Sequence, residues 1–517
     1  MTLGWFGWAD TGTVTAQPYY QTPLVSLYHG DSRTVMADLP ENSVDAVVTD
    51  PPYGLSKEPD ISEVMRHWLA GDDYTHHSKG FMGNSWDSFV PGPALWREMF
   101  RVMKPGAYAA VFASTRTYDL MVTALRFAGF EVVDQLVWSY GNGFPKSMNI
   151  AKALTKAGHP DTAVNYEGYG TALKPAVEPI ALVRKPLIGR YVDNVLVYGT
   201  GGLHIDAVRI QNTTSVSPVR ENEPTATQRY TRNGGTNFAA TPGPRGGSPD
   251  GRYPTNMIFV HHDNCVPVTD TTDDTTIPVY ACVLGCPVRE LDNQSGIRSS
   301  GKPGVMRGTP NRSAAYGAES RKAGEPMVGY GDTGGASRFY PTFQYAAKAS
   351  PQERVTVYIP SPACVNAGHT PDPHAPAANP DLVASETETV CPTCDTPWVA
   401  YQHATVKPLN GTLTGIPTSK KGQTTTGLLG WLARLVCPQG GIILDPFAGT
   451  GTTGAAATAE GFQVIMMEQD PTHVRMTRVR MEQAATQQAT TTAATTAATT
   501  AAAAVVQVVD TNQDALF

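Results

Sequence analysis

Short apolar runs alternate with stretches of helical spacing in the first third of the chain. Residues 24–55 contain an apolar strand, a turn, a helical stretch and a second apolar strand. A further strand is predicted at Ala107 to Phe112, a helix at Thr117 to Ala128 and a strand at Glu131 to Tyr140. Continuous apolar strands between helices are typical of a sheet that helices cover on both faces, so we expect an α/β fold.

The same alternation returns near the C-terminus, after a long irregular stretch. A helix is predicted at Leu428 to Val436, followed by a strand at Gly441 to Leu444, a glycine loop, a helix and a strand at Gln463 to Met467. From about residue 200 to 345 the composition shifts to Gly, Pro, Arg, Ser and Asn. We therefore predict two halves of one core at 20–200 and 403–482, an insertion at 201–402 and a low-complexity tail at 483–517.

Charge and composition limit the class of protein. The net charge of −7 excludes a uniformly basic nucleic-acid coat, so any DNA contact has to come from a local patch. Residues 297–338 offer one, with seven Lys or Arg against three Asp or Glu and with Tyr316 and Tyr330 among them; a solvated loop explains the same charges. No apolar run of about 18 residues and no leader is seen, which predicts a cytoplasmic protein without a membrane anchor.

The first candidate site is Asp50-Pro51-Pro52-Tyr53, directly after an apolar strand. Two prolines end the strand at the carboxyl edge of the sheet, where open α/β sheets bind ligands. The amino group of a base is a poor nucleophile, and the carboxylate of Asp50 and the carbonyl of Pro51 could accept its two hydrogens. Tyr53 would offer the base an aromatic face. A simple turn is the alternative interpretation.

The second candidate site is the loop from Asp445 to Gly454, between a strand and an alanine-rich helix. Its glycines let the backbone approach a ligand at the N-terminus of the helix, and Glu468 at the end of the next strand could accept hydrogen bonds from a ribose. The glycine spacing also fits a nucleotide-cofactor oxidoreductase, so the loop alone leaves the cofactor open.

Together the two sites resemble those of the amino-group-specific DNA methyltransferases of permuted beta order, a family with phage and bacterial members. In that family the catalytic tetrapeptide precedes the cofactor loop, as Asp50 precedes Gly449 here. The resemblance implies a Rossmann-like methyltransferase sheet, S-adenosylmethionine as methyl donor and a flipped base of double-stranded DNA as substrate. An aspartate at the first position favours adenine N6, with cytosine N4 as the alternative. An oxidoreductase explains only the glycine loop, and a non-catalytic DNA-binding module explains only the basic insertion.

The same resemblance assigns the cofactor residues. Asp31, in His29-Gly30-Asp31, is similar to the acidic residue that meets the cofactor adenine. Residues 403–408 resemble the family's His-Pro-Thr-x-Lys-Pro signature, with Ala404 in place of the proline. The resemblance implies that the cofactor is bound by Asp31, Thr405, Lys407, Asp445, Phe447, Ala448, Gly449, Thr450, Gly451, Thr452 and Glu468.

Cysteines in the insertion indicate structural zinc. His262-x-x-Cys265 and Cys282-x-x-x-Cys286 supply four possible zinc ligands at a spacing that suits a tetrahedral site. A second cluster resembles a zinc ribbon and comprises Cys364, Cys391 and Cys394. Structural zinc sites would stabilise a Gly- and Pro-rich segment that lacks an apolar core. The alternative interpretation is that these cysteines are unpaired thiols.

The C-terminal residues form a short motif of their own. Gln513, Leu516 and Phe517 resemble the peptide by which bacterial replication and repair proteins bind the sliding clamp. An arbitrary apolar tail explains the same residues.

Overall fold

The computed structural model places most of the two predicted core halves and parts of the region between them. The described residues are 17–77, 87–141, 143, 145, 147–210, 251–262, 264–268, 279–299, 304–305, 326–327, 333–344, 356–359, 399–402 and 427–486.

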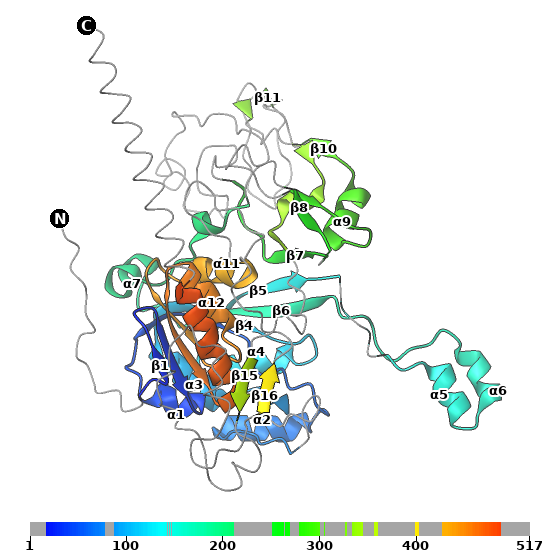
Figure 1. The fold of residues 1–517 in the computed structure, drawn as a ribbon, viewed down its shortest axis with the longest axis horizontal. Coiled ribbons are helices and arrows are strands. Elements are labelled where there is room, and N and C mark those ends of the chain that lie inside the picture. The colour runs from blue at the N-terminus through cyan, green and yellow to red at the C-terminus, as the bar shows by residue number, and fades with distance from the viewer. Residues whose placement is uncertain are drawn as a thin grey trace, which may run out of the picture. The chain divides into compact units, whose positions relative to one another are not determined.

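A ten-stranded sheet forms the centre of the fold (Figure 1). Strands β2, β18, β17, β3 and β4 are parallel neighbours, whereas β4 and β6 pair antiparallel. In spatial order the strands are β1 (Tyr20–Gln21), β2 (Val25–His29), β18 (Gln463–Glu468), β17 (Ile442–Asp445), β3 (Val44–Thr49), β4 (Met103–Phe112), β6 (Val177–Arg184), β5 (Glu131–Ser139), β7 (Met257–His261) and β14 (Thr342–Gln344).

The central strands are buried on both faces, which explains their uninterrupted apolar sequence. Every residue of β3 is buried, Asp45 and Thr49 included. Asp45 accepts a hydrogen bond from Lys104 Nζ at 2.5 Å and another from the backbone N–H of Ile442 at 2.8 Å. The one acidic residue inside β3 is therefore paired, as burial of a charge requires.

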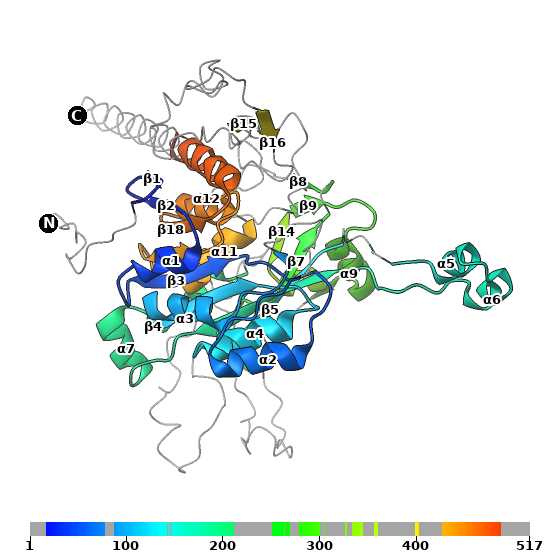
Figure 2. The same ribbon diagram turned by 90° about the horizontal axis from the view of Figure 1, so that it is seen from below.

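Helices cover both faces of the central strands. Side chains of α1, α2, α3 and α4 join alternate residues of β4 (Ala107, Ala109, Val111) in the main core, and α11 and α12 contact β3, β17 and β18. Figure 2 shows α11 and α12 on one side of these strands and α2 and α4 on the other. The helices are α1 (Ser32–Ala37), α2 (Ile61–Ala70), α3 (Pro93–Val102), α4 (Tyr118–Phe127), α7 (Tyr191–Tyr198), α11 (Gly427–Val436), α12 (Thr452–Ala459) and a last one at residues 471–486.

Helix α3 illustrates how the sequence selects these faces. It begins with Pro93, whose missing N–H is not needed in a first helical turn. Pro93, Trp96, Met99 and Val102 recur every three residues and are all buried. The spacing places them on one stripe, which packs against the sheet.

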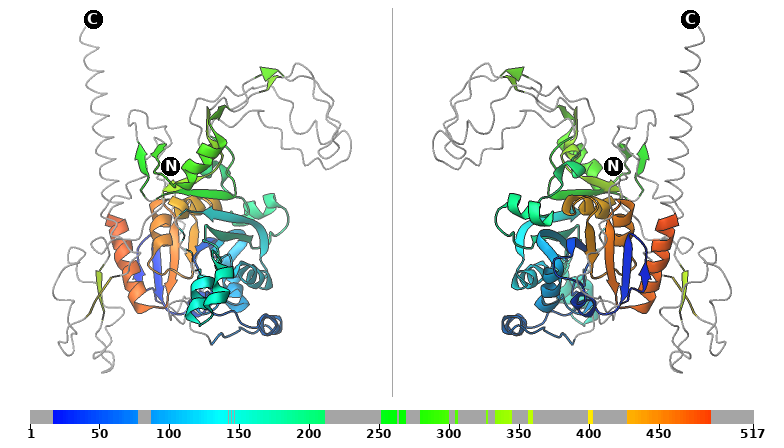
Figure 3. Two further views of the ribbon diagram at one scale, coloured as in Figure 1. Left: turned by 90° about the vertical axis from the view of Figure 1, so that its right-hand side faces the viewer. Right: turned by 90° about the vertical axis from the view of Figure 1, so that its left-hand side faces the viewer.

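Strands from the two distant parts of the sequence pair with each other within the sheet. Strand β18 pairs with β2 in parallel, in a register that sets Val464 beside Val25 and Glu468 beside His29. Figure 3 shows these N-terminal strands, in blue, beside the C-terminal strands, in orange. The predicted α/β class with a large sheet is therefore confirmed.

The chain divides into two compact units. Unit 1 comprises residues 1–135, 179–204 and 346–517, and unit 2 comprises residues 136–178 and 205–345. The predicted boundaries at 200 and 403 stay predictions. Besides β7 and β14, unit 2 contains α5 (Ile150–Lys156), α6 (Pro160–Ala163), the 3-10 helices η3 (Val164–Tyr166), η4 (Ile205–Val208) and η6 (Ala336–Phe339), β8 (Val266–Val268), β9 (Val279–Ala281) and α9 (Pro287–Ser295).

The other described strands form separate pairs. Strand β8 pairs with β9, and the remaining antiparallel pairs are β10 (Arg298–Ser299) with β13 (Thr333–Gly334), β11 (Gly304–Val305) with β12 (Pro326–Met327), and β15 (Thr356–Ile359) with β16 (Val399–Gln402). The insertion was predicted to hold few regular elements, yet two of its strands, β7 and β14, belong to the large sheet.

Candidate active site

Four parallel strands of unit 1 bring the predicted site residues to one edge of the sheet. Asp31 follows β2, Glu468 ends β18, Asp445 ends β17 and Asp50 follows β3. Because these strands are parallel neighbours, their carboxyl ends lie along the same edge. Loops at such an edge are where ligands bind in α/β sheets.

A buried hydrogen bond joins the two loops that the sequence singled out. Thr49 Oγ1, at the end of β3, donates to Asp445 Oδ1 at 2.7 Å. Asp445 is 2% exposed and also accepts hydrogen bonds from the backbone N–H of Phe447 at 3.1 Å and from the side chain of Thr453. Burial raises the pKa of Asp445, and these donors oppose the rise. The side chain of Asp445 thus connects the two loops from inside.

The four residues of the tetrapeptide differ in solvent exposure, and a buried residue follows the exposed Asp50. Asp50 is exposed, Pro51 is buried, and Pro52 and Tyr53 are half-buried. The buried proline fixes the backbone on which Asp50 stands, because its ring restricts φ. An exposed acidic residue and a half-buried tyrosine therefore belong to the same short segment at the sheet edge.

Two residues that the sequence analysis missed hold the tetrapeptide in place. One carboxylate oxygen of Asp87 accepts the backbone N–H groups of Tyr53 at 2.9 Å and of Gly54 at 3.0 Å. Thr117 Oγ1 donates to the carbonyl of Tyr53 at 2.6 Å. Burial raises the pKa of Asp87, while the two amides lower it. No local spacing relates residues 87 and 117 to residue 53, so only the fold could identify them.

Gly54 allows the turn that follows the tetrapeptide. Its φ of +66° is one that residues with a side chain rarely adopt, and a Cβ there would lie 2.8 Å from the backbone nitrogen of Val90. The segment that contains Asp87 is therefore packed directly against this turn.

The second loop is built on glycines with left-handed backbone angles. Gly449 has φ of +53°, and Gly451, which precedes α12, has φ of +79°. A Cβ on Gly454 would lie 2.3 Å from Met466 Sδ, so this glycine lets α12 approach β18 closely. Within the described part of the chain, a Cβ on Gly449 would meet no atom within 4 Å. The loop therefore has free space beside Gly449.

Glu468 is a second carboxyl group of this edge whose pKa is raised by burial. Its Oε2 accepts the N–H of Gly449 at 2.8 Å and its Oε1 accepts the N–H of Asp470 at 2.8 Å. Burial raises the pKa of Glu468 to about 7, against the lowering effect of these amides. Each carboxylate oxygen has a second lone pair, so both can accept a further hydrogen bond from a ligand hydroxyl.

Asp31 caps the helix that follows β2. Its Oδ1 accepts the backbone N–H of Arg33 at 2.9 Å and of Thr34 at 3.3 Å, and its side chain is 52% exposed. The neighbouring Ser32 donates its hydroxyl to the carbonyl of Pro446. The turn that carries Asp31 is thus tied to the glycine loop.

Phe447 presents an aromatic ring next to the same loop. It is half-buried, and its ring centroid lies 6.1 Å from that of Trp96 in an edge-to-face arrangement. The buried Trp96 of α3 supports the ring, whose remaining surface is free to meet an apolar or aromatic group.

Several predicted residues lie outside the described part of the chain. They are Thr405 and Lys407 of the cofactor signature, Cys364, Cys391 and Cys394 of the second metal cluster, and Gln513, Leu516 and Phe517 of the tail.

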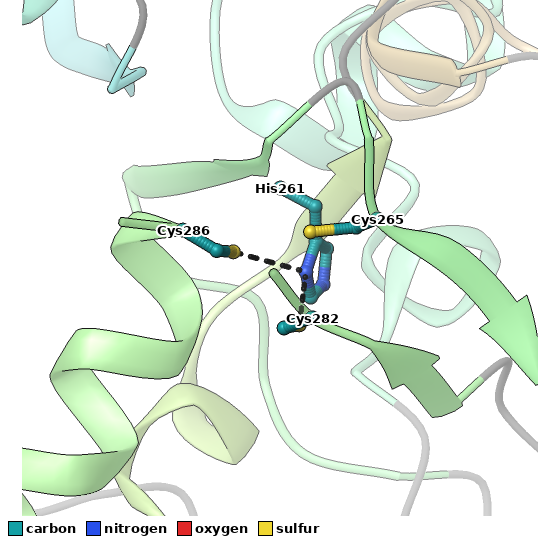
Figure 4. Close-up of side chains that lie close together, drawn as sticks. All are labelled: His261, Cys265, Cys282 and Cys286. Atoms are coloured by element: carbon teal, nitrogen blue, oxygen red, sulfur yellow. Dashed lines mark hydrogen bonds between the residues drawn. The ribbon is translucent and has the colours of Figure 1, made fainter. Parts of the chain in front are cut away.

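The structure brings the other cysteine cluster together with a different histidine. Cys265, Cys282 and Cys286 gather around His261, while His262, which the sequence analysis named, lies outside the cluster (Figure 4). Alternate residues of a strand point to opposite faces. His261 therefore shares a face of β7 with Phe259, which packs against Cys265 and Cys286. The histidine that the structure groups with the three cysteines is therefore His261 and not the predicted His262.

Among the described residues, no helix is both long and apolar enough to span a membrane.

One protein family matches both halves of the core. The model of the N6_N4_Mtase family, described as DNA methylase, matches residues 44–239 and 405–479, which together are just over half of the chain. The matched segments contain the tetrapeptide at 50–53 and the glycine loop at 445–454.

Individual relatives match shorter parts of the chain than the family model does. The Type II methyltransferase M.ScaI of Streptomyces caespitosus is 29% identical over 135 residues, which are 26% of this chain and 40% of that protein. The Type II methyltransferase M.HindIII of Haemophilus influenzae is 26% identical over 178 residues, which are 31% of this chain and 58% of that protein. The chain thus spans about half the length of these curated relatives. The solved structure of the cytosine-N4-specific PvuII DNA methyltransferase aligns over 90% of both chains at 11% identity with a TM-score of 0.35, and a score this low is no argument for a shared fold.

Proposed function

Because the chain belongs to the DNA methylase family, we propose that it transfers the methyl group of S-adenosylmethionine to the exocyclic amine of a base in double-stranded DNA. The hydrogen bond between Thr49 and Asp445, at 2.7 Å, carries this proposal. It ties the strand that precedes Asp50 to the strand that precedes the glycine loop. A donor at the loop and a base at Asp50 would then meet at one edge of the sheet.

The glycine loop and Glu468 fit a nucleoside-containing cofactor. Among the described residues, nothing occupies the position that a Cβ on Gly449 would take, and the Glu468 carboxylate, with its pKa raised by burial to about 7, can still accept hydrogen bonds. In this proposal Glu468 accepts the ribose hydroxyls, Phe447 packs against the cofactor and Asp31 receives its adenine. S-adenosylmethionine supplies an electrophilic methyl group.

Asp50 and its neighbours would prepare the amine. The lone pair of an exocyclic amine is delocalised into the base ring. If the carboxylate of Asp50 and the carbonyl of Pro51 accept its two hydrogens, the nitrogen is held so that its lone pair can form the new bond to carbon. As this bond forms, the bond between the methyl carbon and the sulfur of the donor would break, and the sulfur would leave with the electron pair as a neutral thioether. The nitrogen would become positively charged and then lose one proton, which the Asp50 carboxylate could accept. The half-buried ring of Tyr53 would stack on the base.

The target we propose is adenine N6, since an aspartate stands first in the tetrapeptide. Cytosine N4 is the alternative. Both amines lie inside the duplex, so the base has to be flipped out at a cost of a few kcal/mol, which contacts between the insertion and DNA would offset. The zinc predicted in the insertion would have a structural role and take no part in the transfer.

We extend the proposal to the sequence specificity of the enzyme, its location and a partner protein. The name Type II methyltransferase of both relatives supports methylation at a specific sequence. We also propose a cytoplasmic location in a bacterial or phage-infected cell. The tail with Gln513, Leu516 and Phe517 would bind the bacterial sliding clamp.

Methyl transfer to unmodified DNA tests the proposal. The full chain is incubated with DNA and deuterium-labelled S-adenosylmethionine, and the digested nucleosides are analysed by mass spectrometry. We expect labelled N6-methyladenine, and none with Asp50→Asn, which keeps the size of the side chain and removes its charge. Labelled N4-methylcytosine would change the target amine. Cofactor binding without any labelled base would overturn the proposal.

A further inference from the structure

Unit 2 contains an imidazole and three thiols that the proposed methyl transfer does not use. His261 ends β7, Cys265 precedes β8, Cys282 follows β9 and Cys286 precedes α9. Their donor atoms, one nitrogen and three sulfurs, all lie within 4.8 Å of one another. Figure 4 shows the cysteine side chains directed toward the imidazole from separate segments.

We propose that these four side chains bind one zinc ion in a tetrahedral site. Bonds of about 2.3 Å to sulfur and about 2.0 Å to nitrogen put the ligand atoms of a regular tetrahedron roughly 3.5–3.8 Å apart. His261 Nδ1 lies 3.2 Å from Cys282 Sγ and 3.7 Å from Cys286 Sγ. The atoms are thus already near the separations that the ion requires, and small side-chain adjustments complete the site.

The backbone builds this site from two short turns. The N–H of Cys265 donates to the carbonyl of His262 at 3.0 Å, and the N–H of Cys286 donates to the carbonyl of Val283 at 3.2 Å. The antiparallel pair of β8 and β9, with Val266 opposite Ala281, brings the two turns together. Each turn contributes two ligands four positions apart in the sequence, His261 with Cys265 and Cys282 with Cys286.

Neighbouring groups hold the ligands in position. Backbone N–H groups of His262, Val288 and Arg289 donate to the Cys286 sulfur, and that of Val283 donates to the Cys265 sulfur. The ring of Tyr280 stacks on His261 with centroids 4.0 Å apart, which fixes the orientation of the imidazole.

The apolar core around the cluster is too small to stabilise the segment alone. In the described part of the chain, its buried members are Cys265, Cys286 and Val288, so two of the three are proposed ligands. A structural metal supplies folding free energy where such a core is missing. Four protein ligands leave no open position for a water or a substrate, so the ion is structural rather than catalytic.

Metal analysis of the full chain tests the site, once the second cysteine cluster has been removed by Cys391→Ser and Cys394→Ser. Elemental analysis of this variant is expected to give one zinc per chain. Adding His261→Ala or Cys282→Ser should lower the value to none, whereas His262→Ala, the matched control beside the site, should leave it at one. Less than half a zinc per chain in the parent variant, iron in place of zinc, or loss with His262→Ala would overturn the proposal.

Cobalt exchange keeps the test decisive if the ligand variants fail to fold. Cobalt(II) bound to the folded parent variant is expected to show the intense visible bands of tetrahedral geometry and a sulfur-to-cobalt charge-transfer band. Weak octahedral absorption without the sulfur band would contradict the site.

Discussion

Replacing Thr49 by valine removes the hydrogen bond between the two loops and keeps the shape of the side chain. Thr49 and Asp445 are 1% and 2% exposed, so water cannot replace the lost hydroxyl. Asp445 keeps two donors, the N–H of Phe447 and the side chain of Thr453. A hydrogen bond to a charged group is worth about 1.5–3 kcal/mol, so we expect the free energy of unfolding to fall by about 2 kcal/mol.

The loss should depend on pH in a defined direction. Burial raises the pKa of Asp445, so the stability linked to its protonation is fully present below its unfolded pKa of about 3.9 and is lost as the pH rises through its folded pKa. Without the hydroxyl of Thr49 the folded pKa rises further. The loss of unfolding free energy caused by Thr49→Val is therefore largest where Asp445 is charged. This loss becomes smaller when the pH falls below the folded pKa of Asp445.

Urea unfolding of the wild type, Thr49→Val and Thr49→Ser measures the effect. The serine variant keeps the hydroxyl and should lose much less stability than the valine variant. Methyl transfer should fall in the valine variant as well, because the two loops lose their direct link. Equal stability of the valine variant and the wild type at neutral pH would contradict a stabilising hydrogen bond between Thr49 and Asp445.

Three further outcomes follow from the structure. Asp87→Ala leaves the amides of Tyr53 and Gly54 without their acceptor, so methyl transfer should fall about tenfold or more while calorimetry shows unchanged binding of S-adenosylmethionine; Asp87→Asn, which keeps an acceptor, should be milder. Glu468→Gln should weaken cofactor binding roughly ten- to hundredfold. Since the pKa of Glu468 is raised to about 7, wild-type affinity should rise with pH through that value, and a pH-independent wild type would contradict this role. Removing zinc with a chelator should weaken DNA binding in a shift assay but leave cofactor affinity unchanged. Loss of both DNA binding and cofactor affinity would argue against a zinc ion that stabilises unit 2 alone.

Much of the core could be predicted from the sequence because parallel strands buried on both faces appear as continuous apolar runs. Strands β3 and β17 were found in this way, and each run ends at a residue of the candidate site, Asp50 or Asp445. The glycines at 449 and 451 were predicted from the backbone freedom that such loops require, and both have positive φ.

Contacts between distant segments could not be predicted. Nothing in the spacing of residues 49, 87 and 117 indicates that Thr49 bonds to Asp445, or that Asp87 and Thr117 hold Tyr53. The choice between two adjacent histidines likewise depends on which face of β7 each one shares, and this requires the register of the strand. The Gly- and Pro-rich composition of the insertion also concealed that β7 and β14 extend the sheet.

The two loops are proposed to have different roles, since the loop with Asp50 prepares the amine and the loop with Phe447 binds the cofactor. Cofactor affinity and methyl transfer to DNA are measured for Asp50→Asn and Phe447→Ala side by side. We expect that Asp50→Asn binds S-adenosylmethionine like the wild type yet transfers no methyl group, while Phe447→Ala loses affinity for the cofactor. Methyl transfer by Asp50→Asn at the wild-type rate would contradict the role proposed for Asp50.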